Sequence, residues 1–362
     1  MKRRTLFAAA AATMSLALGL SACGGNGAAG GGGGEDGDNT PVTLTFVTGF
    51  PEKLENNDGF WMFRDKLAEK APWVTIEYRG GPEVIAPTQL IESVSSGAID
   101  GAHLPGDYYT GQLPAMEIQR FTPFSPQQER ENGLVELWQE VHEPIGVHLV
   151  GRTHSGIPQV IMLKDRIDTP DLTGKSVRVS STTSNMVRAL GGTPVEMPGS
   201  EVYTALERGV VQGTTWTSVG VTGLGLEKQA KYYMVPRFYD SVANTVINQD
   251  TWDGLEPATQ EAITEAMAEA EPAIFEHYQA LQADETQKWL DAGVERLEFN
   301  DEDTQRMLKI AYIDAWDTLD WNRITSDSPA ALQIRERFEA EYGGDLKEVV
   351  PGGIDIKGTS EQ

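Results

Sequence analysis

Strand-like and helix-like stretches alternate along the first two thirds of the chain, and this alternation limits the possible folds more than any other feature. Stretches of β-branched residues are followed by amphipathic stretches that end at glycine. Glycine just after a helix and Ser or Thr just before one are typical end signals. Strands that alternate with helices form parallel sheets covered by helices on both faces. Two such blocks therefore predict an α/β fold with two lobes.

The expected elements fall into three groups. The first group has strands at 42–47, 74–78 and 99–103, and helices at 61–68 and 87–96. The second has strands at 177–179, 195–197 and from 210, and helices at 185–190 and 201–208. The third is helical, at 257–290 and 301–342, and is expected to brace both lobes. We expect lobe 1 to comprise 42–150 plus about 241–285, and lobe 2 to comprise 151–240 plus about 286–362.

The first 23 residues predict export and lipidation. A Lys-Arg-Arg start at 2–4 precedes an apolar stretch at 6–20, which is shorter than the about 20 residues that span a bilayer. Leu-Ser-Ala-Cys at 20–23 is a lipobox pattern and ends at the single cysteine, Cys23. We expect a signal peptide over 1–23 and a lipidated Cys23. The lipid would anchor the exported protein either to the outer face of the cell membrane or on the periplasmic side of a membrane. An ordinary cleavage site remains the alternative, and both Sec and twin-arginine export stay open.

Two compositional features bear on partners. Residues 24–41 are rich in glycine and predict a flexible tether between the anchor and the folded part. The formal net charge is −25 at pH 7, which argues against nucleic acid and anionic lipid as partners. An anionic ligand would have to be held by a few local cations, so single arginines become informative.

One arginine lies where α/β folds bind ligands, outside the carboxyl ends of the strands. Arg178 is near the end of the expected strand at 177–179, and five hydroxyl residues follow it at 180–184. A helix N-terminus favours anions, and an arginine offers a planar fork for a carboxylate. The alternative is that Arg178 pairs with an acidic neighbour and that the hydroxyls only cap the helix.

Further ligand-binding candidates follow from position. Trp216 lies beyond the strand expected from 210 and would be either a ligand platform or part of the core. Arg152, at the junction between the lobes, would either face a cleft or lie on the surface. Tyr108, Tyr239 and Asn244 are expected as polar contacts near the strand ends and the hinge.

Catalytic patterns give little. The sequence contains no His-Glu-x-x-His helix, nucleophile elbow, phosphate-binding loop or dinucleotide fingerprint. Asp100 and Asp107 flank a strand end and would suit a hydrolase, but acidic residues are common in this chain. We therefore expect no catalytic residues, no metal ligands and no cofactor, while metal dependence and the oligomeric state stay open.

The second block resembles the solute-binding proteins of TRAP (tripartite ATP-independent periplasmic) transporters, the dicarboxylate-binding family. The stretch at 171–179, DLTGKSVRV, is similar to the family's DLKGLKIRV, and ALGGTPVEMPGSEVYTAL at 189–206 is similar to ALGATPVPMPFSEVYTAL. The stretch at 80–113 is similar to the first lobe of one branch. The likeness spans most of the chain after the tether.

The resemblance implies a two-lobed periplasmic-binding-protein-like fold (type II-like) that closes on a small organic acid and hands it to membrane permease subunits. It also implies that Arg178 clamps the carboxylate, that Arg152 assists and that Trp216 contacts the ligand. Two positions depart from the pattern: Thr215 replaces an acidic residue, and Gly199 replaces a phenylalanine. The first puts a metal contact in doubt, and the second either enlarges the pocket or loosens the loop. A sensory binding protein, a secreted hydrolase and a structural lipoprotein are the alternatives.

Overall fold

The computed structural model describes residues 39–326 and 328–342. The predicted signal peptide, Cys23 and most of the predicted tether lie outside these residues. Within the described ranges, no helix combines the length and the apolar character that crossing a membrane requires.

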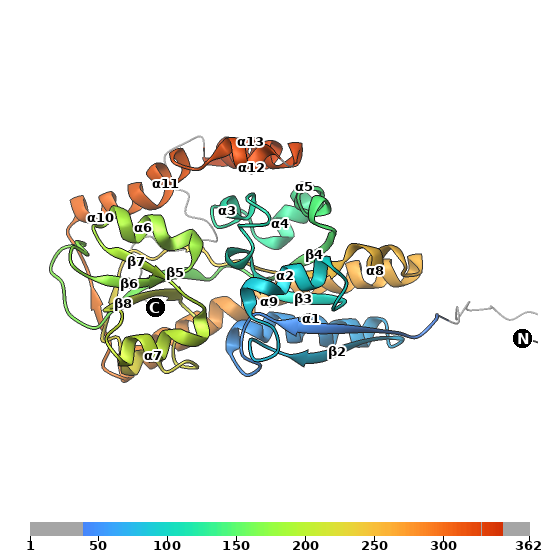
Figure 1. Ribbon diagram of the computed structural model, residues 1–362, viewed down its shortest axis with the longest axis horizontal. Coiled ribbons are helices and arrows are strands. Elements are labelled where there is room, and N and C mark those ends of the chain that lie inside the picture. Colours follow the sequence, from blue (N-terminus) through green and yellow to red (C-terminus); the bar gives the residue numbers. More distant parts are fainter. Residues whose placement is uncertain (1–38, 327, 343–362) are drawn as a thin grey trace, which may run out of the picture. The chain divides into compact units, whose positions relative to one another are not determined.

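Two mixed sheets form the framework (Figure 1). The first sheet has the order β2-β1-β3-β11-β4, and the second has the order β12-β9-β5-β8-β6-β7, with β10 paired to β5. The strands of the first sheet are β1 (Val42–Thr48), β2 (Val74–Gly80), β3 (Gly101–Pro105), β4 (Val147–His154) and β11 (Ala243–Asn248). The strands of the second sheet are β5 (Pro158–Leu163), β6 (Ser176–Val179), β7 (Thr193–Glu196), β8 (Gly213–Thr217), β9 (Tyr232–Met234), β10 (Phe238–Asp240) and β12 (Glu295–Leu297).

Helices cover both sheets. Those that precede the last third of the chain are α1 (Asp58–Lys70), α2 (Pro87–Ser95), α3 (Met116–Gln119), α4 (Pro126–Glu131), α5 (Leu134–His142), α6 (Ser184–Ala189) and α7 (Val202–Glu207). The later ones are α8 (Gln249–Asp253), α9 (Pro257–Asp291), α10 (Asp301–Leu308), α11 (Ala315–Asp317), α12 (Trp321–Ser326) and α13 (Pro329–Tyr342), with a π-helical segment, η7 (Lys309–Asp314), between α10 and α11. Short 3-10 turns are η1 (Glu55–Asn57), η2 (Gly106–Tyr108), η3 (Glu143–Ile145), η4 (Ser181–Thr183), η5 (Gly199–Glu201) and η6 (Leu226–Lys228).

The α/β prediction is confirmed, but the sheets are mixed rather than purely parallel. β1 pairs in parallel with β2 and β3, and β6 pairs in parallel with β7 and β8. Antiparallel pairing occurs between β11 and both β3 and β4, and between β5 and each of β8, β9 and β10. The chain passes between the sheets from β4 to β5 and from β10 to β11. β4 stays in the first sheet as far as His154, so the chain changes sheets a few residues after 150.

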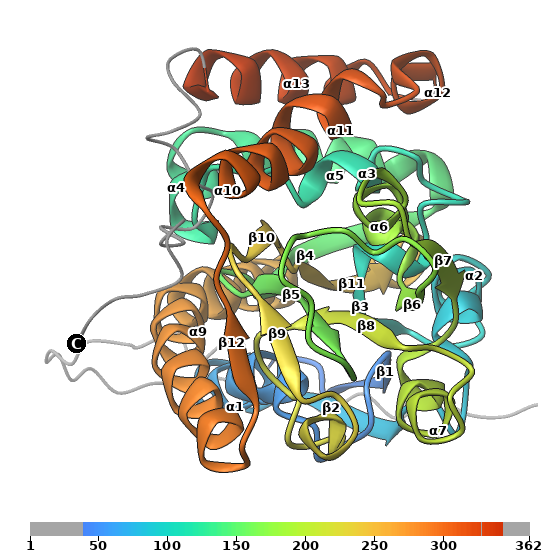
Figure 2. The same cartoon turned by 90° about the vertical axis from the view of Figure 1, so that its left-hand side faces the viewer.

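Helix α9 connects the two sheets (Figures 1 and 2). Its first half packs Ile263, Met267 and Ile274 against α1 and the first sheet. Its end places the fully buried Trp289 in a cluster with Val160 of the second sheet. Burying an aromatic side chain of this size dominates the local packing energy, so α9 stabilises both sheets at once.

The last stretch of the described chain is helical, as the sequence predicts, but it is divided. Residues 301–342 form several short helices, and α13 begins at Pro329, a residue that favours the first turn of a helix. Helices α12 and α13 lie over α4 and α5 in both views, and α13 packs on α5 (Figures 1 and 2). The chain therefore returns to the helices of the first sheet after contributing β12 to the second.

Candidate functional site

A small cavity lies where strand ends of the two sheets face each other. Residues from the first sheet and the turns after its strands form one wall, and β5, β6 and β8 form the other. It is lined by Phe50, Pro105, Asp107, Tyr108, Gln159, Arg178, Ser180, Trp216, Thr217 and Ser241. Three of the six predicted ligand-binding residues, Arg178, Trp216 and Tyr108, are therefore brought together.

Arg178 is the cation of this cavity. It lies in β6 and is only 3% exposed, yet it forms no ion pair with any residue in the described ranges. Its Nε and Nη2 donate to the carbonyl oxygen of Met197, at 3.1 and 2.8 Å, and its Nη1 donates to that of Thr215 at 3.1 Å. Burial lowers the pKa of Arg178, and the neighbouring Tyr108 and Asp107 oppose this shift. The carbonyls hold the guanidinium in place without neutralising its charge.

The hydroxyl residues after Arg178 serve mainly to hold the loop. Ser180 and Thr183 form a capping box at the start of η4, and the Thr183 hydroxyl lies 2.8 Å from that of Thr215. Ser184 donates to Glu196 at 2.7 Å. The capping interpretation therefore accounts for most of these groups, while Ser180 also lines the cavity.

Trp216 lies within β8 rather than beyond it, because the strand begins at Gly213 instead of 210. The ring is 5% exposed, and its centroid is 5.1 Å from Cζ of Arg178. This is a distance at which an aromatic face attracts a cation. The indole Nε1 is buried and has no hydrogen-bond partner among the described residues. Trp216 thus belongs both to the core and to the wall of the cavity.

Gly199 determines where the Trp216 ring lies. A Cβ at this position would lie 2.6 Å from Cη2 of Trp216 and 2.9 Å from its Cζ3. The Gly199 N–H also donates to the Tyr108 hydroxyl at 3.3 Å. The glycine allows the indole to lie directly against the loop, so the departure from phenylalanine is linked to the position of this ring.

Gly199→Ala is expected to displace the Trp216 ring. Extra volume in a packed contact costs about 1–3 kcal/mol, so the melting temperature and the ligand affinity should both fall. Thermal unfolding and ligand titration measure the two effects. Gly111→Ala is the matched control, because a Cβ there meets nothing within 4 Å. Equal behaviour of the two variants would contradict this account of the loop.

The two walls already touch across the cavity. The Ser181 hydroxyl donates to the carbonyl oxygen of Asp107 at 2.7 Å and lies 3.3 Å from the Thr110 hydroxyl. The cavity volume is about 30 Å³, and holding one water molecule takes about 10–15 Å³. Binding an organic molecule here therefore requires the walls to separate and close again.

Arg152 lies in β4 and does not line the cavity. Its Nε is 3.1 Å from Glu129 Oε2, its Nη1 is 3.7 Å from Asp240 Oδ2, and its Nη2 donates to the Phe124 carbonyl oxygen at 2.8 Å. Arg152, Glu129 and Asp240 are each at most 3% exposed. Burial raises the pKa of Asp240 to about 6, and Arg152 opposes this shift. The arginine is thus engaged in a buried ionic cluster.

Asp240 also links the two passages between the sheets. Its Oδ1 accepts a hydrogen bond from the Ile157 N–H at 2.9 Å, and the Ser241 N–H donates to the Ile157 carbonyl oxygen at 2.9 Å. The ionic cluster around Arg152 therefore lies directly beside the hinge segments.

The two remaining candidates, Tyr239 and Asn244, are also buried outside the cavity. Tyr239 has φ 52°, and its ring lies 4.8 Å from Cζ of Arg120. Asn244 forms a reciprocal amide pair with Gln119, at 3.1 and 3.0 Å, and donates to the Tyr109 hydroxyl at 2.6 Å. Tyr239 lies in β10 and Asn244 in β11, on either side of the second passage between the sheets, and neither side chain lines the cavity.

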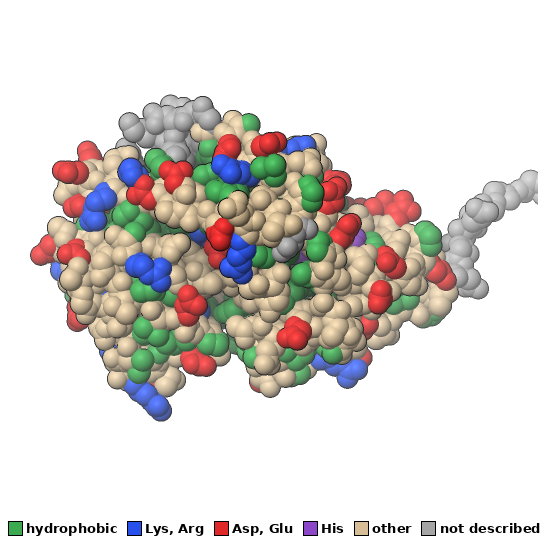
Figure 3. All heavy atoms as spheres, turned by 45° about the horizontal axis from the view of Figure 1, so that its top comes forward, with side chains coloured by type: hydrophobic (Ala, Val, Ile, Leu, Met, Phe, Trp, Pro, Cys, Tyr) green, Lys and Arg blue, Asp and Glu red, His purple; other side chains and the backbone are tan. Residues whose placement is uncertain are grey.

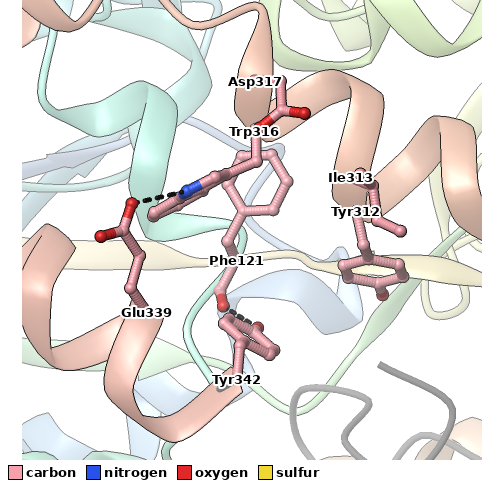
Figure 4. Close-up of a pocket in the computed structure, with 7 residues that line it drawn as sticks. All are labelled: Phe121, Tyr312, Ile313, Trp316, Asp317, Glu339 and Tyr342. Atoms are coloured by element: carbon pink, nitrogen blue, oxygen red, sulfur yellow. Dashed lines mark hydrogen bonds between the residues drawn. The ribbon is translucent and has the colours of Figure 1, made fainter. Parts of the chain in front are cut away.

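A larger cavity lies under the C-terminal helices (Figure 4). Its volume is about 260 Å³, and it is lined by Phe121, Tyr312, Ile313, Trp316, Asp317, Glu339 and Tyr342. The Trp316 Nε1 donates to Glu339 at 3.2 Å, and the Tyr342 hydroxyl donates to the Phe121 carbonyl oxygen. The two charged residues in its lining are both acidic, so this cavity is unsuited to an anion despite its size.

Sequence reasoning missed several lining residues. Phe50 and Pro105 lie at or just beyond the ends of β1 and β3, where the strand-end rule would have found them. Asp107 was considered only together with Asp100, as a possible hydrolase pair. Asp100 does not line the cavity, and it accepts hydrogen bonds from the Thr45 N–H and hydroxyl at 2.8 and 2.7 Å. Gln159 lies inside β5 and gave no local indication. The described residues include no cluster of three or more His, Cys, Asp or Glu side chains suited to a metal ion.

The surface gives no indication of a polyanionic partner on the face shown in Figure 3, where acidic and basic side chains are interspersed. The formal net charge of the chain is −25, so the overall field repels anions and Arg178 supplies a positive charge only locally.

Known proteins resemble this chain in sequence and in fold. A monocarboxylate 2-oxoacid-binding periplasmic protein of Nostoc sp. is 25% identical over 312 residues, which cover 83% of this chain and 84% of the relative. A TRAP periplasmic solute-binding protein from Desulfovibrio salexigens with bound orotic acid superposes with a TM-score of 0.74 at 18% identity, covering 83% of this chain and 99% of that one. One from Rhodoferax ferrireducens with bound malonate has a TM-score of 0.72 at 18% identity, covering 83% and 100%.

The model of one protein family, described as bacterial extracellular solute-binding protein, family 7, matches residues 58–316. This range includes α1, most of both sheets and, except for Phe50, the residues that line the Arg178 cavity. The resemblance inferred from the stretches at 171–179 and 189–206 is confirmed, and so is the two-lobed fold. The family consists of solute-binding receptors rather than enzymes. The chain belongs to family 7 of the bacterial extracellular solute-binding proteins, the solute receptors of TRAP transporters.

Proposed function

We propose that this protein captures a small organic acid in the cavity between its two sheets and delivers it to the membrane subunits of a TRAP transporter. The observation that carries the proposal is Arg178, a guanidinium buried in the cavity wall without an ion-pair partner among the described residues. A buried charge is retained where it is paired or where it serves a ligand. An organic carboxylate supplies the missing partner.

The Tyr108 hydroxyl marks the position that a carboxylate oxygen would take. It accepts a hydrogen bond from the Gly199 N–H at 3.3 Å, and it lies near enough to Arg178 to favour the charged form of the guanidinium. An anionic oxygen at this position would accept from the same N–H beside the guanidinium and form stronger, charge-assisted bonds. The partnerless Nε1 of Trp216 is a further donor in the same wall. Binding would then displace the tyrosine hydroxyl as the lobes open.

Similar proteins support the ligand class. The Nostoc relative is named for monocarboxylate 2-oxoacids, and the two related structures contain orotic acid and malonate. These compounds share a carboxylate and differ in the rest of the molecule. We therefore assign the carboxylate to Arg178 and leave recognition of the remaining atoms to the other residues of the cavity.

The binding cycle we propose is a hinge motion without turnover. The walls separate at the passages beside Asp240, admit the acid and close through the contacts of Ser181, and a permease recognises the closed form. We further propose that a lipidated Cys23 holds the protein at the outer face of the membrane, within reach of that permease. No catalytic step, metal or cofactor enters this function.

A thermal-shift screen against small organic acids tests the proposal. A ligand that binds only the folded state raises the melting temperature by mass action. Each acid should be paired with its neutral amide, which keeps the shape and removes the charge. A shift with the acid but not with the amide supports carboxylate capture. A shift only with sugars or cations would overturn it, and consumption of a bound acid would favour the hydrolase alternative.

A further inference from the structure

The cavity holds a carboxyl group as well as a guanidinium. Asp107 lies in η2, directly after β3, and lines the same cavity as Arg178 of β6. Neither side chain forms an ion pair with the other or with any residue in 39–326 and 328–342. Asp107 is nevertheless close enough to favour the charged form of Arg178. The site thus presents two opposite charges, separated from each other, to one small ligand.

The Asp107 side chain retains hydrogen-bonding capacity for a ligand. The hydroxyls of Ser180 and Thr182, from the opposite wall, lie near enough to its carboxyl group to favour the charged form. An ionised carboxylate has about four acceptor positions, so these two hydroxyls leave further positions open. Arg120 lies near enough to favour its charged form, and Glu117 acts against it. Burial is the largest influence and raises the pKa of Asp107. A hydrogen-bond donor on the ligand would offset the cost of removing this carboxylate from water.

A second carboxylate on the ligand would have the opposite effect. Held by Arg178 at one end, a short dicarboxylate would bring its other carboxylate towards Asp107, and like charges in a buried site repel strongly. Among the residues that line the cavity, Arg178 is the only cation, so nothing else there would neutralise the second charge. The remaining polar groups of the lining, such as Gln159 and Ser241, are neutral.

We propose that Asp107 makes the site selective for short monocarboxylates that carry a hydrogen-bond donor, either a hydroxyl or an ammonium group, and excludes dicarboxylates of the same length. The inference rests on the proposed function, because it places the ligand carboxylate on Arg178. Selection works by attraction to the donor and by repulsion of a second anion. The small volume of the contracted cavity, about 30 Å³, favours a short chain.

Four acids with the same three-carbon skeleton test the proposal: propionate, lactate, alanine and malonate. Calorimetric titration of the mature protein should show that lactate or alanine binds at least tenfold more tightly than propionate and malonate. A preference for lactate identifies a hydroxyl as the donor, and a preference for alanine identifies an ammonium group. Malonate binding as tightly as the better of lactate and alanine, or propionate doing so, would overturn the proposal.

Asp107→Asn links this ranking to one residue. The amide keeps the shape and an acceptor oxygen but removes the charge, so malonate should gain affinity and alanine should lose about tenfold, with a smaller loss for lactate. Asp168→Asn, whose side chain is 93% exposed, is the control and should leave the ranking unchanged. An unchanged order of affinities for the four acids in Asp107→Asn would contradict the proposal. If neither lactate nor alanine binds while another carboxylate raises the melting temperature, the selectivity is wrong and the proposed function stands.

Discussion

Arg178→Ala is expected to weaken ligand binding by about 10- to 150-fold. A hydrogen bond to a charged group contributes about 1.5–3 kcal/mol, and this substitution removes the only guanidinium that lines the cavity. Calorimetric titration with the acid found in the thermal-shift screen measures the change. Binding with unchanged affinity would show that the carboxylate lies elsewhere.

Two further variants make this result interpretable. The guanidinium also donates to the carbonyl oxygens of Met197 and Thr215, so its removal lowers stability as well, and affinity must be measured far below the melting temperature. Arg178→Lys keeps the charge but loses the planar fork, and we expect an intermediate affinity. Arg208→Ala removes an exposed arginine of the same lobe and should bind as the unmodified protein does.

Arg152→Ala is expected to destabilise the protein by about 3–5 kcal/mol, because it leaves the buried carboxyl groups of Glu129 and Asp240 without their cation. Urea unfolding measures the loss. Arg166→Ala is the matched control: Arg166 also lies near two carboxylates, Asp168 and Glu295, but its side chain is 56% exposed. Exposed pairs contribute about 0–1 kcal/mol, so the control should change little.

The loss caused by Arg152→Ala should depend on pH. Burial already raises the pKa of Glu129 and Asp240, and Arg152 opposes both shifts, so its removal raises both values further. The folded variant then binds protons that the unfolded chain does not bind, and its stability falls as the pH rises through this window. The deficit relative to the unmodified protein should therefore be larger at pH 7 than at pH 5. A variant with unchanged stability but weaker ligand binding would instead support the ligand role that the resemblance implied for Arg152.

Local sequence patterns predicted most of the framework. The alternation of apolar and polar residues located β1, β2, α1, α2 and α9, and the strand-end rule pointed to Arg178. The patterns erred where tertiary contacts decide the outcome. The strand expected from 210 begins at Gly213, because Val210 is exposed and the pairing with β5 starts at the glycine. The segment at 301–342 is helical as expected, and only the structure shows that it is divided among several helices that pack on different parts of the fold.

The family and the two-lobed class were determined by the sequence alone, because periodicity and motif spacing are properties of neighbouring residues. The roles of the two arginines were not. Arg152 and Arg178 both lie in strands and both are buried. The five hydroxyl residues after Arg178 pointed to that arginine, but no neighbour of Arg152 in the sequence indicates the charge partners that it finds in the fold. Folding brings Glu129 of α4 and Asp240 of β10 to Arg152, whereas Arg178 meets only backbone carbonyls, a tryptophan face and a cavity. Which charge remains available for a ligand depends on partners distant in the chain, and only the tertiary structure shows them.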